Sequence, residues 1–472
     1  MRNRGNWAVA VLCVLAGCGD DGHGPSDAAI DAVDAPPDAE GTIDPRPQVA
    51  EIYATPNRDL DLLFVVDDSP SMQDKQANLA ANFPNFVNVL TALPGGLPNL
   101  HLGVVSTDMG TKGTDVAQPG PPIGSLGNGG CSMTGKGGRL TVNGAAVSDA
   151  YVSDIKLTDG SRQRNYTGTL ATVFSQMARL GGNGCGFEQP LHAMKVALDG
   201  NAANVGFLRP NALLAVVFVT DEDDCSIADP AMFGPASPTL GPLQSFRCTR
   251  FGVTCQQGGQ TSDAMNQIGP KTGCSGSVGS TFMSDVAPYA QFLKTLKGDT
   301  RLVATAAIVG NTTPVAVELR TPPGGGTAMP ALAHSCTYQG SQGQEVADPA
   351  VRIQQFLTQF PNRHVSSTIC QQDLSAGLGQ IGQLLTQSIG NPCITRQLAD
   401  LDPGTPGLQP DCVVEDIVGS TITRIPACGS APCWRFETDP ATCTVGDHLK
   451  LVIDRPQAPD PATVTTMRCA VP

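Results

Sequence analysis

Two apolar runs constrain the fold more than any other feature of the 472-residue sequence. Residues 61–66 (Asp-Leu-Leu-Phe-Val-Val) and residues 212–219 (Ala-Leu-Leu-Ala-Val-Val-Phe-Val) contain almost no polar side chain. Such continuous runs are typical of strands that are buried on both faces of a parallel sheet. The chain must then cover both faces of that sheet with helices, which predicts an α/β fold.

Helical and extended patterns alternate along the rest of the chain. Residues 73–93 place Leu79, Phe83 and Leu90 near one stripe of a helix. Further predicted strands are residues 101–106, 302–309 and a short one from 364, and further predicted helices are residues 170–180, 189–198, 284–296, 351–360 and 374–389. This alternation predicts βαβ units and a doubly wound, mostly parallel, Rossmann-like sheet.

Three long insertions interrupt the predicted sheet, at residues 108–168, 225–282 and 311–346. Each carries at least one cysteine, and the chain is rich in glycine (53) and proline (38). We expect these loops to be cross-linked rather than to build cores of their own. Residues 391–472 hold six cysteines and strand-like pieces, which predicts a small cystine-rich β domain with three disulfides of open connectivity.

The N-terminus has the pattern of an export signal. Two arginines precede an apolar run, residues 7–16, which is too short to cross a bilayer. The run ends Leu-Ala-Gly-Cys at residues 15–18, which resembles the lipobox of bacterial lipoproteins. That resemblance implies a signal peptide over residues 1–17 and acylation of Cys18, with an ordinary secretion signal as the alternative.

The cysteine count agrees with export. Loss of Cys13 with the signal peptide and acylation of Cys18 leave 14 of the 16 cysteines, an even number that suits up to seven disulfides in an oxidising compartment. Residues 18–50 follow as an acidic Asp/Ala/Pro-rich stretch, which predicts an extended tether, with an acidic metal-storage tract as the alternative. The tether leads into a main domain predicted over residues 51–390.

Charge and motif patterns exclude several classes of partner. The net charge of −14 argues against a nucleic-acid-binding surface. Residues 130–136 imitate a phosphate-binding loop, but Gly137 stands where that motif needs Ser or Thr, and no buried strand precedes it. We therefore expect neither nucleic acid nor nucleotide as a ligand.

The first apolar run is followed directly by a set of oxygen-bearing side chains. Asp67, Ser69 and Ser71 form an Asp-x-Ser-x-Ser sequence before the helix of residues 73–93, and Asp221 follows the second run as part of Thr-Asp. Ligands bind at the carboxyl ends of strands in open α/β sheets. Hard divalent cations prefer such oxygen ligands. Two neutral hydroxyls neutralise none of the ion's charge, so the ion can attract a carboxylate from another molecule.

These motifs resemble the von Willebrand factor type A (vWA) domain over roughly residues 57–390. The resemblance implies a metal-ion-dependent adhesion site (MIDAS) formed by Asp67, Ser69, Ser71 and Asp221, with Mg²⁺ as the expected ion and Mn²⁺ or Ca²⁺ as alternatives. The family supplies a threonine from a further loop, and here Glu188 stands near that place. Glu188 either coordinates the ion or caps the following helix, where a carboxylate is favoured by the helix dipole.

Other acidic residues near these loops are candidates for indirect contacts to the ion. Asp221 begins an Asp-Glu-Asp-Asp run, so Asp223 and Asp224 are possible neighbours of the site, as is Asp108 after the strand of residues 101–106. The alternative is that the run is a solvated acidic loop. Cys185 and Cys225 lie beside the two predicted loops, and we expect disulfides there to fix the geometry of the site.

The sequence thus predicts a lipid-anchored protein of the bacterial cell envelope, placed at the outer membrane on its periplasmic or surface side. Its expected function is not enzymatic: it binds a protein partner through a divalent cation, in adhesion, envelope assembly or surface recognition. One alternative is a scaffold with a purely structural cation and an interface on the insertions. A metal-dependent hydrolase that uses the acidic loop of residues 221–224 is the third hypothesis.

The anchoring hypothesis makes a direct prediction. Because Cys18 is the expected acylation site, Cys18→Ala should release the protein from membranes or leave its precursor unprocessed. Membrane fractionation and metabolic labelling with a fatty acid measure this. Labelled fatty acid still entering the N-terminus of the variant would contradict the assignment.

Overall fold

The structure is a computed structural model that describes residues 48–52, 58–456 and 464–472. Short gaps within these ranges fall at residues 94–95, 158–159, 211, 299, 323–324, 342, 390–392, 395, 419–420, 441–442 and 444–445. The predicted signal peptide, Cys18 and nearly all of the predicted tether lie outside the described residues. No helix in the described part of the chain is both long and apolar enough to cross a membrane.

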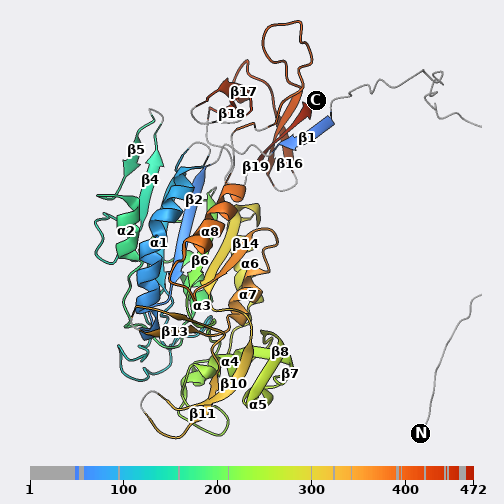
Figure 1. The fold of residues 1–472 in the computed structure, drawn as a ribbon. Coiled ribbons are helices and arrows are strands. Elements are labelled where there is room, and N and C mark those ends of the chain that lie inside the picture. The colour runs from blue at the N-terminus through green and yellow to red at the C-terminus, as the bar shows by residue number, and fades with distance from the viewer. Residues whose placement is uncertain are drawn as a thin grey trace, which may run out of the picture. The chain divides into compact units, whose positions relative to one another are not determined.

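A seven-stranded mixed sheet forms the centre of the main domain, in the order β14–β9–β6–β2–β3–β4–β5 (Figure 1). The first five strands in that order are parallel, and β4 and β5 extend the edge as an antiparallel hairpin. The strands are β2 (Asp59–Val66), β3 (Asn99–Ser106), β4 (Val152–Lys156), β5 (Arg162–Arg164), β6 (Leu213–Val219), β9 (Val303–Val309) and β14 (His364–Thr368). The α/β prediction is confirmed at this level, whereas the β4–β5 hairpin was missed inside the first insertion.

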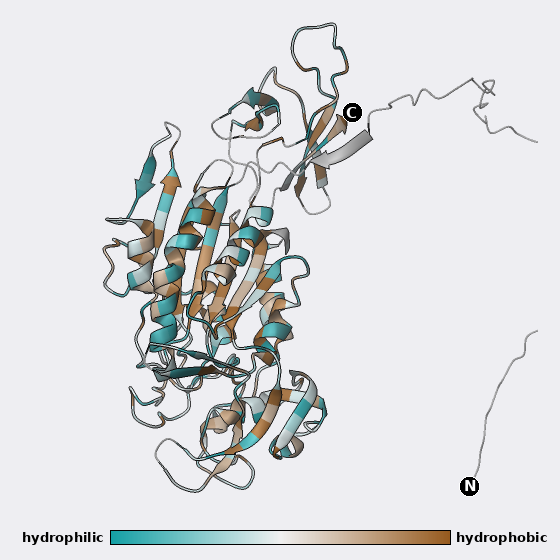
Figure 2. Ribbon diagram, viewed as in Figure 1, coloured by the Kyte–Doolittle hydropathy of each residue, from teal (hydrophilic) through white to brown (hydrophobic). Residues whose placement is uncertain are grey.

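Helices cover both faces of this sheet, and the strand residues alternate between them. Leu62 and Phe64 of β2 belong to one hydrophobic cluster, whereas Leu63 and Val65 belong to another. The first cluster includes α1 (Gln73–Thr91), α2 (Leu170–Met177) and α8 (Ser375–Ser388), and the second includes α3 (Pro190–Leu198), α6 (Ala287–Lys297) and α7 (Val351–Leu357). The central strands are accordingly hydrophobic along their length (Figure 2), as expected for strands that are buried on both sides.

The second and third insertions differ from the prediction because they build a common sheet with its own core. That antiparallel sheet has the order β11–β10–β8–β7, so strands from both insertions pair. Its elements are α4 (Phe246–Gly252), β7 (Val253–Gln257), α5 (Ser262–Met265), β8 (Gly269–Gly276), β10 (Val315–Arg320) and β11 (Met329–Leu332). Phe246, Met265, Val317 and Leu332 are among the residues of its hydrophobic cluster. The expectation that these loops lack a core was therefore wrong, because each insertion supplies the apolar face that the other needs.

A separate hairpin in the third insertion lies against α1. It consists of β12 (Cys336–Gln339) and β13 (Gln344–Ala347). The Asp74 carboxylate accepts hydrogen bonds from the backbone N–H and the hydroxyl of Ser341, at 2.7 and 2.5 Å. Asn78 donates to the Tyr338 hydroxyl at 3.0 Å. The start of α1, next to the predicted cation site, is therefore held by a segment some 270 residues away in the sequence.

The C-terminal residues form a β module with a cluster around Trp434, Leu451 and Met467. Its strands are β15 (Cys412–Val418), β16 (Thr421–Ile425), β17 (Cys433–Thr438), β18 (Leu449–Asp454) and β19 (Val464–Val471). A strand from the other end of the chain, β1 (Gln48–Ile52), pairs with β19 to complete the sheet order β1–β19–β15–β16. The predicted boundary near residue 50 thus falls inside a strand of this module rather than between the tether and the main domain.

Seven disulfides pair all 14 cysteines that the sequence predicts to be cross-linked. The pairs are Cys131–Cys185, Cys225–Cys248, Cys255–Cys274, Cys336–Cys370, Cys393–Cys443, Cys412–Cys469 and Cys428–Cys433. The last three lie in the C-terminal module, which confirms the prediction of three bridges there. Disulfides that close loops of this size each stabilise a fold by about 2–4 kcal/mol.

This pairing predicts that the purified protein has none of these 14 thiols free. Thiol titration of protein unfolded without reductant should detect none of them, whereas the same sample after reduction should yield all 14. The physical reason is that each cysteine already has a bonded partner in the fold. Several thiols reacting before reduction would contradict the framework.

Candidate functional site

The candidate site lies where the chain reverses direction across the sheet. β2 leads through α1 to β3 on one side, and β6 leads to β9 and β14 on the other. The loops after β2 and β6 therefore leave the same edge side by side, which is the usual position of a ligand site in open α/β sheets. The backbone N–H of Asp67 donates to the carbonyl of Val219 at 2.9 Å and fixes the two loops together.

Asp67 is fully buried at the base of this site. One carboxylate oxygen accepts from the backbone N–H of Ser69 at 2.7 Å, and the other accepts from the Thr220 hydroxyl at 2.7 Å. The first bond closes a tight turn, and Pro70 then begins the short 3-10 helix Pro70–Met72 that leads into α1. Proline suits this first helical position because its missing N–H is not needed there.

Two hydroxyls and a second carboxylate converge above Asp67. The Ser69 and Ser71 hydroxyl oxygens are 3.1 Å apart, and the Ser71 hydroxyl donates to Oδ1 of Asp221 at 3.2 Å. Ser69 and Asp221 are buried, whereas Ser71 is exposed. The structure thus brings together the four residues that the sequence predicted as ligands, and it leaves one side of the group open to solvent.

Lys75 is a member of the site that the sequence analysis missed. Its ammonium contacts Oδ2 of Asp221 at 3.0 Å, Oε2 of Glu345 at 2.6 Å and the carbonyl of Ser71 at 3.1 Å. Burial disfavours its charge, but the carboxylates of Asp221 and Glu345 outweigh burial and raise the pKa of Lys75. A lysine in the first turn of a helix opposes the dipole, and this was the signal in the sequence that a carboxylate must lie nearby.

Glu188 does not cap α3. The backbone N–H groups at the start of that helix donate instead to Asp224 Oδ1 (from Leu191, 3.1 Å) and to the Ser226 hydroxyl (from His192, 2.9 Å). Both carboxylate oxygens of Glu188 are buried and accept no hydrogen bond from a described protein donor. The alternative that Glu188 is a helix cap is therefore wrong, and its role as a cation ligand stays a prediction.

The carboxyl groups in this region raise one another's pKa values. Burial and the neighbouring Asp221 raise the pKa of Asp67 to about 7. Burial and the adjacent Glu222 raise the pKa of Glu188 well above its usual range, and burial and Asp348 do the same for the pKa of Glu222. Buried carboxylates without enough donors are stabilised by a proton or by a cation. The donor set of carboxylates and hydroxyls therefore fits a hard divalent cation.

The carboxylates of Asp223 and Asp224 bind groups on helices rather than the predicted cation ligands. Asp223 accepts from the backbone N–H groups of Arg352 and Ile353 at 2.9–3.1 Å, at the start of α7. Asp224 pairs with the buried guanidinium of Arg352 at 2.9 Å and also accepts from the Ser226 hydroxyl at 2.5 Å. The alternative of a solvated acidic loop is excluded for these two residues, because both are buried.

Asp108 stabilises the loop after β3. Its Oδ1 accepts from the backbone N–H of Gly110 at 2.9 Å, and burial raises its pKa. A side chain on Gly110 would lie 2.2 Å from the Ser132 carbonyl, and the backbone there has φ +59°. Only glycine fits that position. The hydrogen bond from Gly110 to the Asp108 carboxylate therefore closes a tight turn.

The end of β3 and the first insertion each place one side chain against Asp68, in the loop after β2. The Asp68 carboxylate accepts from the Ser106 hydroxyl at 2.6 Å and pairs with the Lys136 ammonium. A cavity of about 590 Å³ opens beside this pair, with Lys136 and Arg139 among its lining residues. Residues 130–136 imitate a phosphate-binding loop in sequence, and nothing in that pattern indicates that Lys136 returns to the sheet edge.

One other group has ligand atoms close enough for a metal ion by distance alone. Among the described residues, Cys428, Cys433 and Asp454 have ligand atoms within 4.8 Å of one another. Both cysteines are joined in a disulfide, so neither offers a thiolate. The carboxylates around Asp67 do not form so close a set, and hydroxyls and water must complete any coordination sphere there.

Comparisons with known proteins identify no family. No family model matches the sequence, and no curated protein matches it. Similar solved structures include proximal thread matrix protein 1 from the mussel byssus (11% identity, 71% of this chain and 50% of that chain, TM-score 0.28) and the pilus adhesin SpaC of Lactobacillus rhamnosus GG (11%, 88% and 39%, 0.30). The pilus adhesin RrgA of Streptococcus pneumoniae is similar at 10% identity, over 90% of this chain and 58% of that chain, with TM-score 0.24. TM-scores this low transfer neither a fold family nor a function, and each alignment spans only part of the other protein.

The buried pair of Arg352 and Asp224 gives a prediction on stability. Arg352→Met should lower the free energy of unfolding by about 3–5 kcal/mol, because it leaves Asp224 buried without its counter-charge. Urea unfolding measures this. The matched control is Arg320→Met, whose partner Glu318 is exposed, and it should cost about 1 kcal/mol or less. Equal losses in the two variants would contradict the structural role of the buried pair.

Proposed function

We propose that this chain carries a vWA-type domain that binds a protein partner through a divalent cation held by Asp67, Ser69, Ser71 and Asp221. The observation that carries the proposal is that two adjacent loops bring these four side chains together. The Ser69 and Ser71 hydroxyls are 3.1 Å apart, the Ser71 hydroxyl donates to Asp221 at 3.2 Å, and the Asp67 carboxylate accepts from the backbone N–H of Ser69. The parallel order β14–β9–β6–β2–β3 and the helices on both faces agree with the vWA hypothesis.

The charge of this group supports a cation as its ligand. Lys75 neutralises one side of Asp221, but no cation of the described residues pairs with Glu188, whose carboxylate lies next to that of Glu222. A divalent cation would supply the positive charge that these carboxylates lack, with Mg²⁺ expected and Mn²⁺ or Ca²⁺ as alternatives. The exposed Ser71 marks the side from which a partner's carboxylate could reach it.

The setting of this activity is part of the same proposal. We infer an exported lipoprotein of the bacterial envelope, anchored at the outer membrane through Cys18 and acting in adhesion, assembly or surface recognition. Seven disulfides support export, because such bridges persist in oxidising compartments. The hydrolase hypothesis loses two of its candidate groups, since Asp223 and Asp224 bind backbone amides and Arg352.

A second candidate function is a scaffold whose cation is structural and whose interface lies on the insertions. The observation that favours it is the additional sheet β11–β10–β8–β7, which offers a binding surface away from the cation site. The two candidates differ in one outcome: chelation abolishes partner capture in the first and spares it in the second.

Calorimetry with Mg²⁺, Mn²⁺ and Ca²⁺ tests the site itself. Asp67→Ala should weaken binding at least about 100-fold, because it removes a buried charged ligand, whereas Ser69→Ala removes a neutral ligand that water can replace and should cost about 10-fold. Glu188→Gln should weaken binding if its carboxylate is a ligand. Lys75→Met should tighten binding about 10-fold or more, because it removes a positive charge 3.0 Å from Asp221.

The matched control is Asp263→Ala, which removes an exposed carboxylate elsewhere in the chain and should leave cation binding unchanged. Partner capture from envelope extract, with and without chelator, then separates the two candidate functions. Cation affinity that is the same in Asp67→Ala, Asp221→Ala and the unmodified protein would end the proposal.

A further inference from the structure

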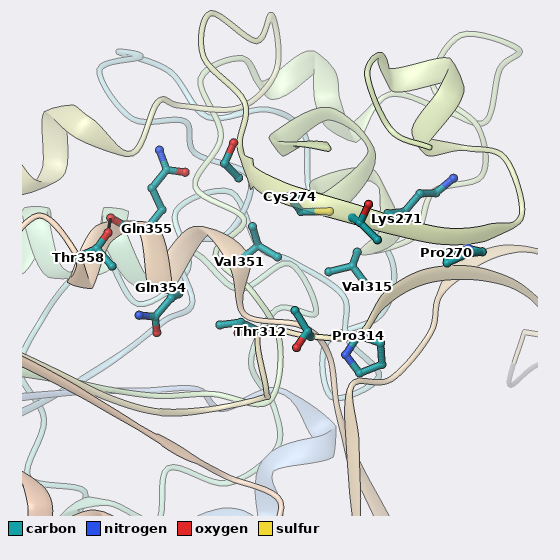
Figure 3. A pocket seen from close by; sticks show the side chains of 14 residues that line it. Pro270, Lys271, Cys274, Thr312, Pro314, Val315, Val351, Gln354, Gln355 and Thr358 are labelled. Atoms are coloured by element: carbon teal, nitrogen blue, oxygen red, sulfur yellow. Dashed lines mark hydrogen bonds between the residues drawn. The ribbon is translucent and has the colours of Figure 1, made fainter. Parts of the chain in front are cut away.

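A groove between β8 and α7 is independent of the cation site. It encloses about 570 Å³, which is in the range of ligand-binding pockets. Val351, Gln354, Gln355 and Thr358 of the α7 segment line one side of the groove, and the strand that carries Cys274 lines another (Figure 3). Thr312 and Pro314, just before β10, close a third side.

The groove exists because two paired strands separate. β10 pairs with β8 from Val317↔Gly269 to Val315↔Lys271 and no further. The residue just before β10 is Pro314, which has no backbone N–H to donate to the ladder. β8 nevertheless continues to Gly276, paired on its other edge with β7. Residues 272–275 of β8 therefore border the groove without a partner on that side among the described strands.

At the end of the unpaired edge of β8, a glutamine side chain of α7 already accepts a backbone hydrogen bond. The backbone N–H of Gly276 donates to Oε1 of Gln355 at 2.5 Å. This bond shows that a backbone amide of β8 points toward α7. The unpaired amides of an edge strand point outward from the sheet in the same way. An extended peptide lying beside residues 272–275 could make the same kind of bond with its main chain.

The lining of the groove selects for an uncharged peptide. Thr272, Ser275, Thr312, Gln354 and Thr358 offer hydroxyls and amides, and Val315 and Val351 offer apolar contact. Lys271 is the one charged residue in the lining, and its ammonium donates to the carbonyls of Ala264 (3.0 Å) and Gln267 (2.7 Å). Figure 3 shows it directed away from α7. A charged side chain would find no counter-ion here and would lose its hydration.

We propose that this groove binds an extended, uncharged segment of a partner protein, which adds as a strand to the open edge of β8. Main-chain hydrogen bonds would supply most of the affinity, and the hydroxyl and amide side chains of the groove would favour small polar and β-branched residues in the peptide. The proposal does not depend on the cation site, so chelation should leave this binding unchanged.

The test uses the full chain and a fluorescent, end-capped octapeptide, Ser-Thr-Val-Thr-Gln-Val-Thr-Ser, with binding followed by fluorescence anisotropy. We expect saturable binding that falls at least about 10-fold when alternate amides of the peptide are N-methylated, because strand addition needs those N–H groups. A version with Glu in place of Gln and both Val residues should also bind at least about 10-fold more weakly.

Variants of the protein then locate the binding site. Thr358→Trp fills the groove from an exposed position and should reduce binding at least about 10-fold. Gln291→Trp, on the exposed side of α6 and outside the groove, is the matched control and should bind as the unmodified chain does. Unchanged thermal unfolding verifies that both variants fold. Absence of saturable binding up to 1 mM peptide, equal binding of the N-methylated peptide, or equal binding by Thr358→Trp would each overturn the proposal.

Discussion

The pairing of β2 with β6 is the constraint on which the candidate site depends. Their parallel register ends at Val66↔Val219, so the next residues of both strands, Asp67 and Thr220-Asp221, must lie together whatever their charges. Each buried Leu, Val or Phe of these strands contributes about 1.5–3 kcal/mol. The several such residues in each strand outweigh the few kcal/mol by which two buried carboxylates destabilise the fold. The pairing of these strands thus places two carboxylates close together, and the strands themselves supply no positive charge to neutralise them.

Lys75 neutralises only part of that negative charge, and it also binds a carboxylate of the third insertion. Its ammonium is shared between Asp221 of the site and Glu345 of β13. Asp74 and Asn78 bind the same hairpin through Ser341 and Tyr338. Because a cation at Asp221 would repel the ammonium, cation binding and the docking of this hairpin are linked, and by thermodynamic reciprocity each changes the affinity of the other by the same factor.

The sequence predicted the central strands and their helices because continuous apolar runs and helical spacing are local signals. Asp67, Ser69, Ser71 and Asp221 could be found for the same reason, since they lie in the segments that follow two of these strands. The rest depended on contacts between distant segments. Nothing near Glu188 indicates that Asp224 and Ser226 occupy the start of α3 in its place. Likewise, no periodicity within either insertion shows that β8 of one pairs with β10 of the other.

The acidic run after β6 connects the candidate cation site with the helix that lines the groove. Asp221 faces the site, whereas Asp223 accepts from the first N–H groups of α7 and Asp224 holds Arg352 of the same helix. Gln354, Gln355 and Thr358, which line the groove beside β8, follow within two turns of Arg352. The position of the groove wall is therefore set by the loop that also carries a predicted cation ligand. Consecutive carboxylates in this run therefore bind different partners. Their burial, rather than their number, shows that the run is not a solvated acidic loop.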